Sequence, residues 1–165
     1  MGVGNFVMTM NKSVLFLVST AILLSGVFVT GFVGAHGGAT GVVKERMELM
    51  KSLGDRMKEM GAMMKGKVAF SSEVIAANAS EIQQASPDIL RVFPEGSLKK
   101  PSEALPRVWE EWDRFNEMTD RLTGEAGKLN DVAITGTRRE IMIQFTKVGK
   151  TCSSCHTDFR KKKEK

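Results

Sequence analysis

The sequence predicts an all-α protein built as a four-helix bundle. Two stretches, residues 43–68 and 141–159, carry residues on one face that step by four and three positions in alternation, which is the spacing of a helix with one buried side. Two stretches between them show helical periodicity, and no segment alternates polar and apolar residues as a half-buried β-strand does. A chain of 165 residues is compatible with one folded domain.

Residues 1–35 are predicted to be a secretory signal peptide. They contain no acid and a single base, Lys12, which is followed by the apolar run 14–33 and by a small-x-small cleavage pattern ending at Ala35. The run is close to the length that spans a bilayer, so a retained membrane anchor is the alternative. In either case residues 36–165 are expected to form one bundle in an exported, periplasmic compartment.

The first and second helices are predicted over residues 43–68 and 68–85. The first has an unbroken seam with spacings of 4, 3, 4, 3, 4, 3 and 4, formed by Val43, Met47, Met50, Gly54, Met57, Gly61, Met64 and Val68. The second is marked by Val74, Ile75, Ala79 and Ile82. It is expected to stop before Pro87, because the residue before a proline disfavours the helical conformation.

A long crossover, residues 86–105, is predicted next because it holds three of the four prolines. Pro106 suits the first turn of a third helix, where a missing N–H costs nothing. That helix shows Trp109, Trp112, Phe115, Thr119 and Leu122 on one side. It is expected to end at Gly124 and Gly127. The last helix is predicted to begin near Asn130, with a seam formed by Ile141, Phe145, Val148, Cys152, Cys155 and Phe159.

The seam of the last helix contains Cys152-Ser153-Ser154-Cys155-His156, the attachment signature of c-type haem. Residues three and four apart share one face of a helix, so both thiols and the imidazole point the same way. The thiols can then add to the two vinyl groups of one porphyrin while the imidazole binds its iron. A haem would therefore lie inside the bundle.

Three other kinds of site share parts of this motif. A thioredoxin-like redox pair normally opens a helix after a strand, and no such strand is predicted. A zinc site needs about four ligands, and the second histidine, His36, lies far upstream. A structural disulfide between Cys152 and Cys155 is possible, although it gives His156 no role.

The position of the motif near the C-terminal end, together with two other segments, is similar to one known family. Residues 44–51, then Gly54 and Met57, and then Met64-Lys65-Gly66 look like its opening helix. Pro106-Arg107-Val108-Trp109 looks like the start of its third helix. The chain thus resembles the class II c-type cytochromes, the cytochrome c prime family and its low-spin relatives. The resemblance covers nearly all of residues 36–165 and implies a four-helix bundle around one covalently bound haem c.

The resemblance also implies roles for individual residues. Cys152 and Cys155 would be the thioether anchors, and His156 the proximal iron ligand. Arg46 falls where the family has a base near the haem propionates, and Arg160 falls beside the proximal imidazole. For both arginines, an exposed charge on a helix is the alternative; near the C-terminal end of a helix such a charge also compensates the helix dipole.

Met50 aligns with the family position that faces the iron opposite the histidine. In low-spin members a methionine there supplies its sulfur as sixth ligand, whereas high-spin members leave the iron five-coordinate. Methionine is also a common filler of helix cores, and Met47 and Met57 are its rivals on the same seam. The prediction is that His156 and Met50 both bind the iron.

The function expected from this ligation is electron transfer by an exported protein with one haem, because iron bound by histidine and methionine keeps its coordination in both oxidation states. The alternative is a five-coordinate haem protein that binds nitric oxide or carbon monoxide, if Met50 is not a ligand. Neither is an enzyme. Redox partner proteins and a homodimer are the expected partners. Nucleic acid is not, since the net charge of +5 includes a short lysine run at the C-terminus and no basic residues arrayed with aromatics.

Overall fold

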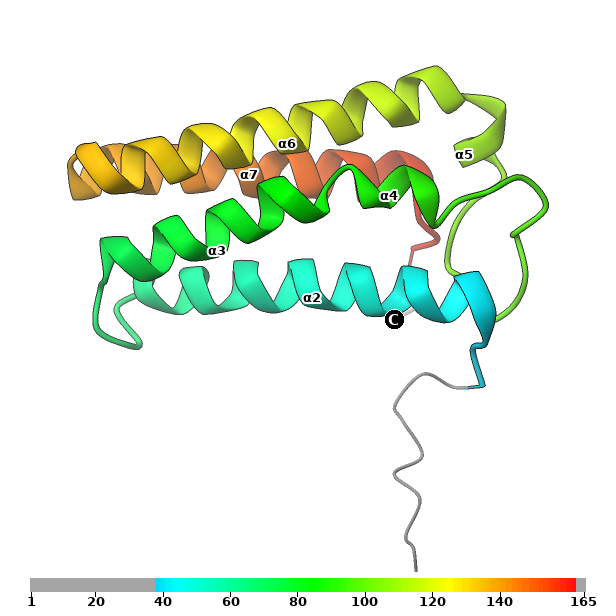
Figure 1. Ribbon diagram of the computed structural model, residues 1–165, viewed down its shortest axis with the longest axis horizontal. Coiled ribbons are helices and arrows are strands. Elements are labelled where there is room, and N and C mark those ends of the chain that lie inside the picture. Colours follow the sequence, from blue (N-terminus) through cyan, green and yellow to red (C-terminus); the bar gives the residue numbers. More distant parts are fainter. Residues whose placement is uncertain (1–37, 163–165) are drawn as a thin grey trace, which may run out of the picture. The chain divides into compact units, whose positions relative to one another are not determined.

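Four long helices dominate the computed structural model, which describes residues 38–162. They are α2 (Gly41–Met64), α3 (Ser72–Ala85), α6 (Trp112–Thr135) and α7 (Arg138–Phe159). The short helices α4 (Asp88–Arg91) and α5 (Arg107–Glu110) lie in the crossover between α3 and α6 (Figure 1). Residues 38–162 contain no β-strand, only an isolated antiparallel bridge between Ala104 and Arg160. The predicted all-α, four-helix architecture is confirmed.

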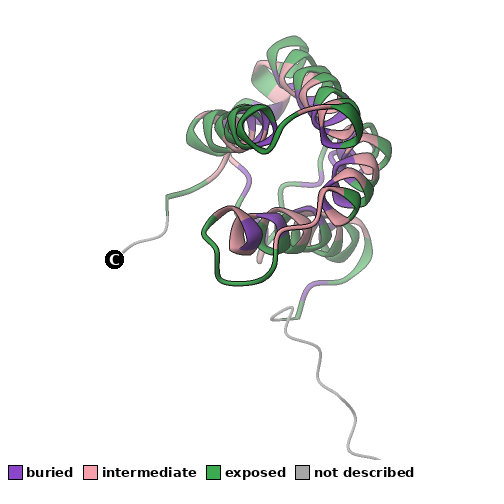
Figure 2. Ribbon diagram, turned by 90° about the vertical axis from the view of Figure 1, so that its left-hand side faces the viewer, coloured by how far each residue is buried: buried purple, intermediate pink, exposed green. Residues whose placement is uncertain are grey.

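The helices pack around a common interior. Helix α3 packs against both α2 and α6, and α6 packs against α7. A view along the bundle shows the buried residues of each long helix turned inward (Figure 2). The largest fully buried side chains include Met60, Ile75, Ile82, Val108, Leu129, Ile141 and Val148. Burial of these apolar surfaces is the main favourable contribution to folding.

Helix α2 ends four residues before the predicted boundary. Gly66 takes a left-handed conformation, with φ of 68°, and its N–H donates to the carbonyl of Met63 at 3.1 Å. Glycine adopts this conformation readily, and it commonly ends a helix. Helix α3 then begins at Ser72 rather than at Val68, because the hydroxyl of Ser71 caps it by accepting from the N–H of Val74 at 3.2 Å. The predicted stop before Pro87 is confirmed.

The predicted end of the third helix at Gly124 and Gly127 is wrong. Helix α6 continues through both glycines to Thr135. Gly127 is buried, and a Cβ atom there would lie 2.7 Å from Nε2 of Gln83 in α3. This glycine therefore permits close packing between α3 and α6 and does not end the helix. The third helix was also predicted to be continuous from Pro106, but the structure interrupts it at Glu111, which separates α5 from α6.

The last helix begins at Arg138, not near Asn130. Gly136 is extended, with φ of −93° and ψ of 173°, and it separates α6 from α7. Thr137 and Glu140 then form a capping box: the N–H of Glu140 donates to the Thr137 hydroxyl at 3.4 Å, and the N–H of Thr137 donates to the Glu140 carboxylate at 2.7 Å. The Thr-x-x-Glu spacing is the sequence signal that marks this start.

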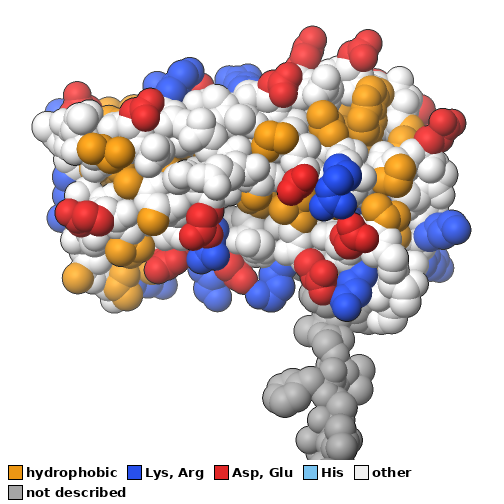
Figure 3. Space-filling view, viewed as in Figure 1, with side chains coloured by type: hydrophobic (Ala, Val, Ile, Leu, Met, Phe, Trp, Pro, Cys, Tyr) orange, Lys and Arg blue, Asp and Glu red, His pale blue; other side chains and the backbone are white. Residues whose placement is uncertain are grey.

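The surface carries charges of both signs, as the face in Figure 3 shows. Exposed ion pairs link neighbouring helices: Arg91 of α4 pairs with Glu45 of α2 at 2.9 Å, and Arg56 of α2 pairs with Glu81 of α3 at 2.5 Å. Pairs of this kind contribute little to stability, because water screens them. On this face, acidic and basic side chains are therefore interspersed and exposed to water.

The predicted signal segment, residues 1–35, lies outside the described residues. In the part of the chain that the structure describes, no helix combines the length and the apolar character needed to cross a membrane.

Candidate haem site

A cavity of about 660 Å³ lies between α2, α6, α7 and the crossover. Pockets for cofactors and small molecules usually measure about 300–1,000 Å³, so this volume suits a ligand of that size. Its wall is largely apolar and includes Met47, Met50 and Met57 of α2, Phe115, Met118 and Leu122 of α6, and Phe159 of α7. A largely apolar cavity of this kind, open on one side, fits a flat, hydrophobic cofactor.

Cys152, Cys155 and His156 all line this cavity from α7, as their helical spacing predicts. Both cysteines are half-buried and unpaired, so the alternative of a disulfide does not describe this structure. Among the described residues, no three His, Cys, Asp or Glu side chains gather to hold a metal ion. Two thiols and one imidazole on a single helix face are the donor set that a c-type haem requires, so the residues present fit that group.

Burial shifts the pKa of each of these three groups toward the uncharged form. It raises the pKa of the Cys155 thiol to about 11, with smaller contributions from Cys152 and Asp158, and it also raises the pKa of Cys152. His156 as a residue is exposed, yet burial of part of its ring and then the positive charge of Arg160 lower its pKa, against the opposing effect of Glu103. A neutral imidazole is the form that binds iron.

Helix α2 forms one wall of the cavity with three methionines, Met47, Met50 and Met57, here called the methionine wall. These three side chains are half-buried, whereas the buried residues of this helix are Val43, Arg46, Leu53, Met60 and Met63. The predicted seam thus faces the cavity over its middle part. Gly54 lines the same wall, and a Cβ atom there would meet nothing within 4 Å. The space in front of Gly54 is open to a cofactor.

Arg46 is buried, with 4% of its surface exposed, so the alternative of a solvated helix charge is wrong. Its guanidinium donates to the carbonyl of Val92 at 2.9 Å and to the hydroxyls of Ser97 and Ser102 at 2.6 and 2.7 Å. It also stands 4.0 Å from the ring centroid of Phe93. Burial lowers its pKa. Arg46 therefore binds α2 to the crossover and lines the cavity; its contact with a propionate stays a prediction.

Arg160 follows α7 directly and lies at the cavity beside His156. Its guanidinium pairs with Glu103 of the crossover, with Nε at 2.7 Å from Oε2. The backbone fixes the same contact, because the N–H of Lys161 donates to the carbonyl of Glu103 at 2.8 Å. Arg160 is thus held at the edge of the site by the crossover.

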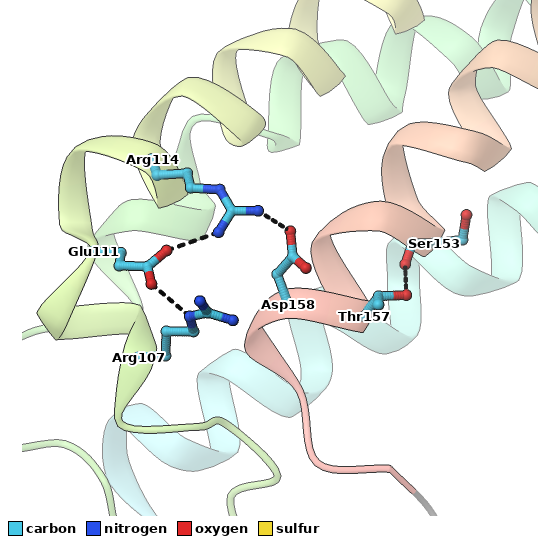
Figure 4. A network of polar contacts seen from close by, with 6 residues as sticks. All are labelled: Arg107, Glu111, Arg114, Ser153, Thr157 and Asp158. Atoms are coloured by element: carbon cyan, nitrogen blue, oxygen red, sulfur yellow. Dashed lines mark hydrogen bonds and ion pairs between the residues drawn. The ribbon is translucent and has the colours of Figure 1, made fainter.

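A polar network joins the α5–α6 junction to the end of α7 (Figure 4). Glu111 accepts from Arg107 at 2.5 Å and from Arg114 at 2.8 Å, and Arg114 also contacts Asp158 at 2.5 Å. Sequence reasoning missed Arg114, Asp158, and the crossover residues Ser97, Ser102 and Glu103. Their partners lie 44 to 57 positions away along the chain, and no local spacing signals such contacts.

The family model described as Cytochrome C′ matches residues 41–160. A curated relative, the cytochrome c′ of Rhodocyclus tenuis, is 37% identical over 62 residues, which are 38% of this chain and 47% of that protein. The matched region thus spans about half the length of this relative.

Solved structures are similar over most of the chain. Cytochrome c′ from Rhodopseudomonas palustris is 28% identical with a TM-score of 0.71, covering 76% of this chain and 100% of that one. Cytochrome c prime from Shewanella frigidimarina is 26% identical with a TM-score of 0.69, covering 73% and 94%. A nitric oxide complex of a cytochrome c prime variant from Alcaligenes xylosoxidans, at 24% identity with a TM-score of 0.67 and coverage of 74% and 94%, shares the fold.

These comparisons correct the expected function. The predicted electron carrier of the low-spin branch, in which Met50 would be a sixth ligand of the iron, is wrong, because the matching family model and these relatives are cytochromes c′, a group known for five-coordinate haem. Ligation by His156 stays a prediction. The physical reason lies in the α2 wall. Met50 is one of three half-buried methionines that line the cavity there, and methionine commonly fills such space without binding a metal.

Proposed function

Because the chain belongs to the cytochrome c′ family, we propose that it holds a five-coordinate haem that binds nitric oxide or carbon monoxide. The family binds one covalently attached c-type haem, so the predicted haem c is confirmed. The observation that carries the gas-binding proposal is the asymmetry of the cavity. One wall offers two thiols and an imidazole, whereas the α2 wall offers methionine thioethers, Leu53 and Gly54. The charged groups of α2 at the cavity, on Arg46 and Lys51, are already bound to other residues of the protein.

The residues of α7 would hold the cofactor. Cys152 and Cys155 would each add S–H across a vinyl group, which leaves a thioether bond, and His156 would bind the iron from the same side. Arg46 and Arg160 would lie near the propionates and the imidazole. When bound, the haem would supply an iron with a free position for a diatomic gas.

The polar groups of the cavity favour gases that need no hydrogen bond. The hydroxyl of Thr119 donates to the carbonyl of Phe115 at 3.1 Å, and that of Thr151 donates to Lys147 at 3.1 Å, so neither hydrogen points into the space. Donors near the iron are among the features that decide between binding and activating dioxygen. Lys51, which also lines the cavity, pairs with Asp55 at 2.5 Å. A wall of this kind suits nitric oxide and carbon monoxide.

The cellular setting follows the family. Its members are generally not enzymes, are periplasmic and are often dimers. We therefore expect this protein to be exported after removal of residues 1–35, to lack a substrate reaction and to form a homodimer. Exchange of electrons with redox partner proteins stays a prediction, and no individual partner is proposed.

A visible spectrum of the reduced protein, with and without carbon monoxide, tests the proposal. We expect a broad high-spin band that shifts when carbon monoxide is added. The variant Met50→Leu is the matched control and should show the same high-spin band, because no iron–sulfur bond is lost. A sharp, split low-spin spectrum that ignores carbon monoxide, and that becomes high-spin in Met50→Leu, would overturn the proposal.

A further inference from the structure

The last turn of α7 carries Cys155 and His156 and ends at Phe159, so whatever holds this turn also sets the direction of the imidazole. Asp158 lies two residues after His156, and its carboxylate is 2.5 Å from Nη2 of Arg114 in α6. The side chain of Asp158 is 22% exposed and that of Arg114 is 45% exposed. An ion pair that is partly shielded from water is stronger than one fully exposed.

Arg114 is itself fixed from the other side. Its Nη1 donates to Oε2 of Glu111 at 2.8 Å, and Glu111 also accepts from Arg107 at 2.5 Å (Figure 4). These hydrogen bonds, first that of Arg107, lower the pKa of Glu111. Glu111 lies at the junction of α5 and α6. The guanidinium of Arg114 is therefore held at this junction by Glu111 while it contacts α7.

Arg114 also contacts the next residue of the same turn. Its guanidinium carbon is 5.8 Å from the ring centroid of Phe159, within the range of a cation–π contact. Phe159 is buried, lines the cavity, and meets Phe115 edge-on at 5.2 Å. One side chain of α6 therefore touches two consecutive residues of the turn that carries the imidazole.

We propose that Arg114 is a positioning residue for the haem-bearing turn of α7: it fixes the turn through Asp158 and Phe159 and balances the charge of the Asp158 carboxylate. The inference rests on the proposed attachment to Cys152 and Cys155 and ligation by His156. The turn has a second support, because the N–H of Leu105 donates to the carbonyl of Phe159 at 2.9 Å. Loss of Arg114 should therefore tilt the turn without unfolding it.

The test compares Arg114→Gln, Asp158→Asn and the double variant in the haem-bearing protein. The readouts are the iron–histidine stretching band in resonance Raman spectra of the reduced protein and the reduction potential. We expect each single substitution to shift the band, and the double variant to shift it no further than the larger single shift, because all three lose the same contact. The potential should fall in Arg114→Gln, since an unbalanced carboxylate favours ferric iron.

Two further variants separate positioning from general effects. Arg121→Gln removes the same charge from an exposed site on α6 and should leave band and potential unchanged. Arg114→Lys keeps the positive charge, but an ammonium is a point charge and cannot hold both carboxylates as the guanidinium fork does. The reduction potential of this variant should therefore stay near that of the parent, while its iron–histidine band shifts.

The proposal is overturned if haem-bearing Arg114→Gln and Arg114→Lys show the same band as Arg121→Gln, or if the two single shifts simply add. A parent protein without covalent haem would instead overturn the proposed function, and this inference with it.

Discussion

Arg46 places a guanidinium inside the bundle, and every hydrogen bond that it makes to the described residues goes to a carbonyl or a hydroxyl oxygen. A buried charge without a carboxylate partner is costly unless its donors are satisfied. Here Val92, Ser97 and Ser102 satisfy them, and the ring of Phe93 covers one face of the guanidinium. Arg46 therefore connects α2 to the crossover between α3 and α6 through several hydrogen bonds.

Replacing Arg46 should therefore destabilise the protein. We expect Arg46→Ala to lower the free energy of unfolding by about 2–3 kcal/mol, because it leaves buried acceptors unsatisfied and removes packed volume. Urea unfolding of the haem-bearing protein measures this change. The control Arg121→Ala, at an exposed position of α6, should change stability by less than about 0.5 kcal/mol. A loss from Arg46→Ala as small as that of the control would contradict the structural role.

At the scale of helices, periodicity predicted the faces better than the ends. The seam of the last helix was right, since Ile141, Val148 and Phe159 are buried while Cys152 and Cys155 line the cavity. The predicted seam of the first helix includes the methionines that line the cavity. A heptad-like pattern identifies the residues that face the bundle centre, and it is the same whether side chains or a cofactor fill that centre. Fold and haem motif could therefore be read from the sequence.

The errors came from glycines, whose meaning depends on tertiary contacts. Gly127 accommodates Gln83 of α3, which no local pattern reveals, whereas Gly136 and the Thr137–Glu140 capping box mark the true boundary. A sixth ligand was wrongly expected for a related reason. A methionine in the right place on a helix is the same in sequence whether it binds iron or fills space.

The continuity of α6 predicts opposite responses to two glycine substitutions. Gly124 is exposed in mid-helix with nothing within 4 Å of a Cβ position, so Gly124→Ala should raise the unfolding free energy by about 0.5–1 kcal/mol. Gly127→Ala should gain less, because the amide of Gln83 must move. Thermal unfolding of both variants checks this. If Gly124→Ala were no more stable than the parent, the helix would not run through this position.

At the scale of the molecule, the crossover and the cavity connect parts that are distant in sequence. Arg46 reaches 46 to 56 positions ahead to the crossover, and Glu103 reaches 57 positions to Arg160. The long helices also differ in support: α3 packs on two neighbours, whereas α2 packs mainly on α3 and turns its methionine wall to the cavity. The cofactor would therefore supply much of the packing of α2.

Hydrogen exchange should reveal this dependence. In the variant Cys152→Ala with Cys155→Ala, which cannot attach haem, amides of α2 should exchange faster than those of α3 and α6. In the haem-bearing protein the difference should shrink, because the cavity is filled and local opening becomes harder. Mass spectrometry of peptides from each helix measures both states. Equal exchange of α2 and α6 in the variant would show that the bundle holds α2 without the cofactor.

Acid–acetone extraction of the protein, produced in a host that attaches haem to exported proteins, tests the central claim most directly. A porphyrin joined by thioether bonds to α7 must stay with the polypeptide, and the Cys152→Ala and Cys155→Ala double variant must lose it. The account predicts a coloured precipitate from the parent and a colourless one from that variant. A parent polypeptide that gives up its porphyrin to the solvent, or that never carries one, would contradict it.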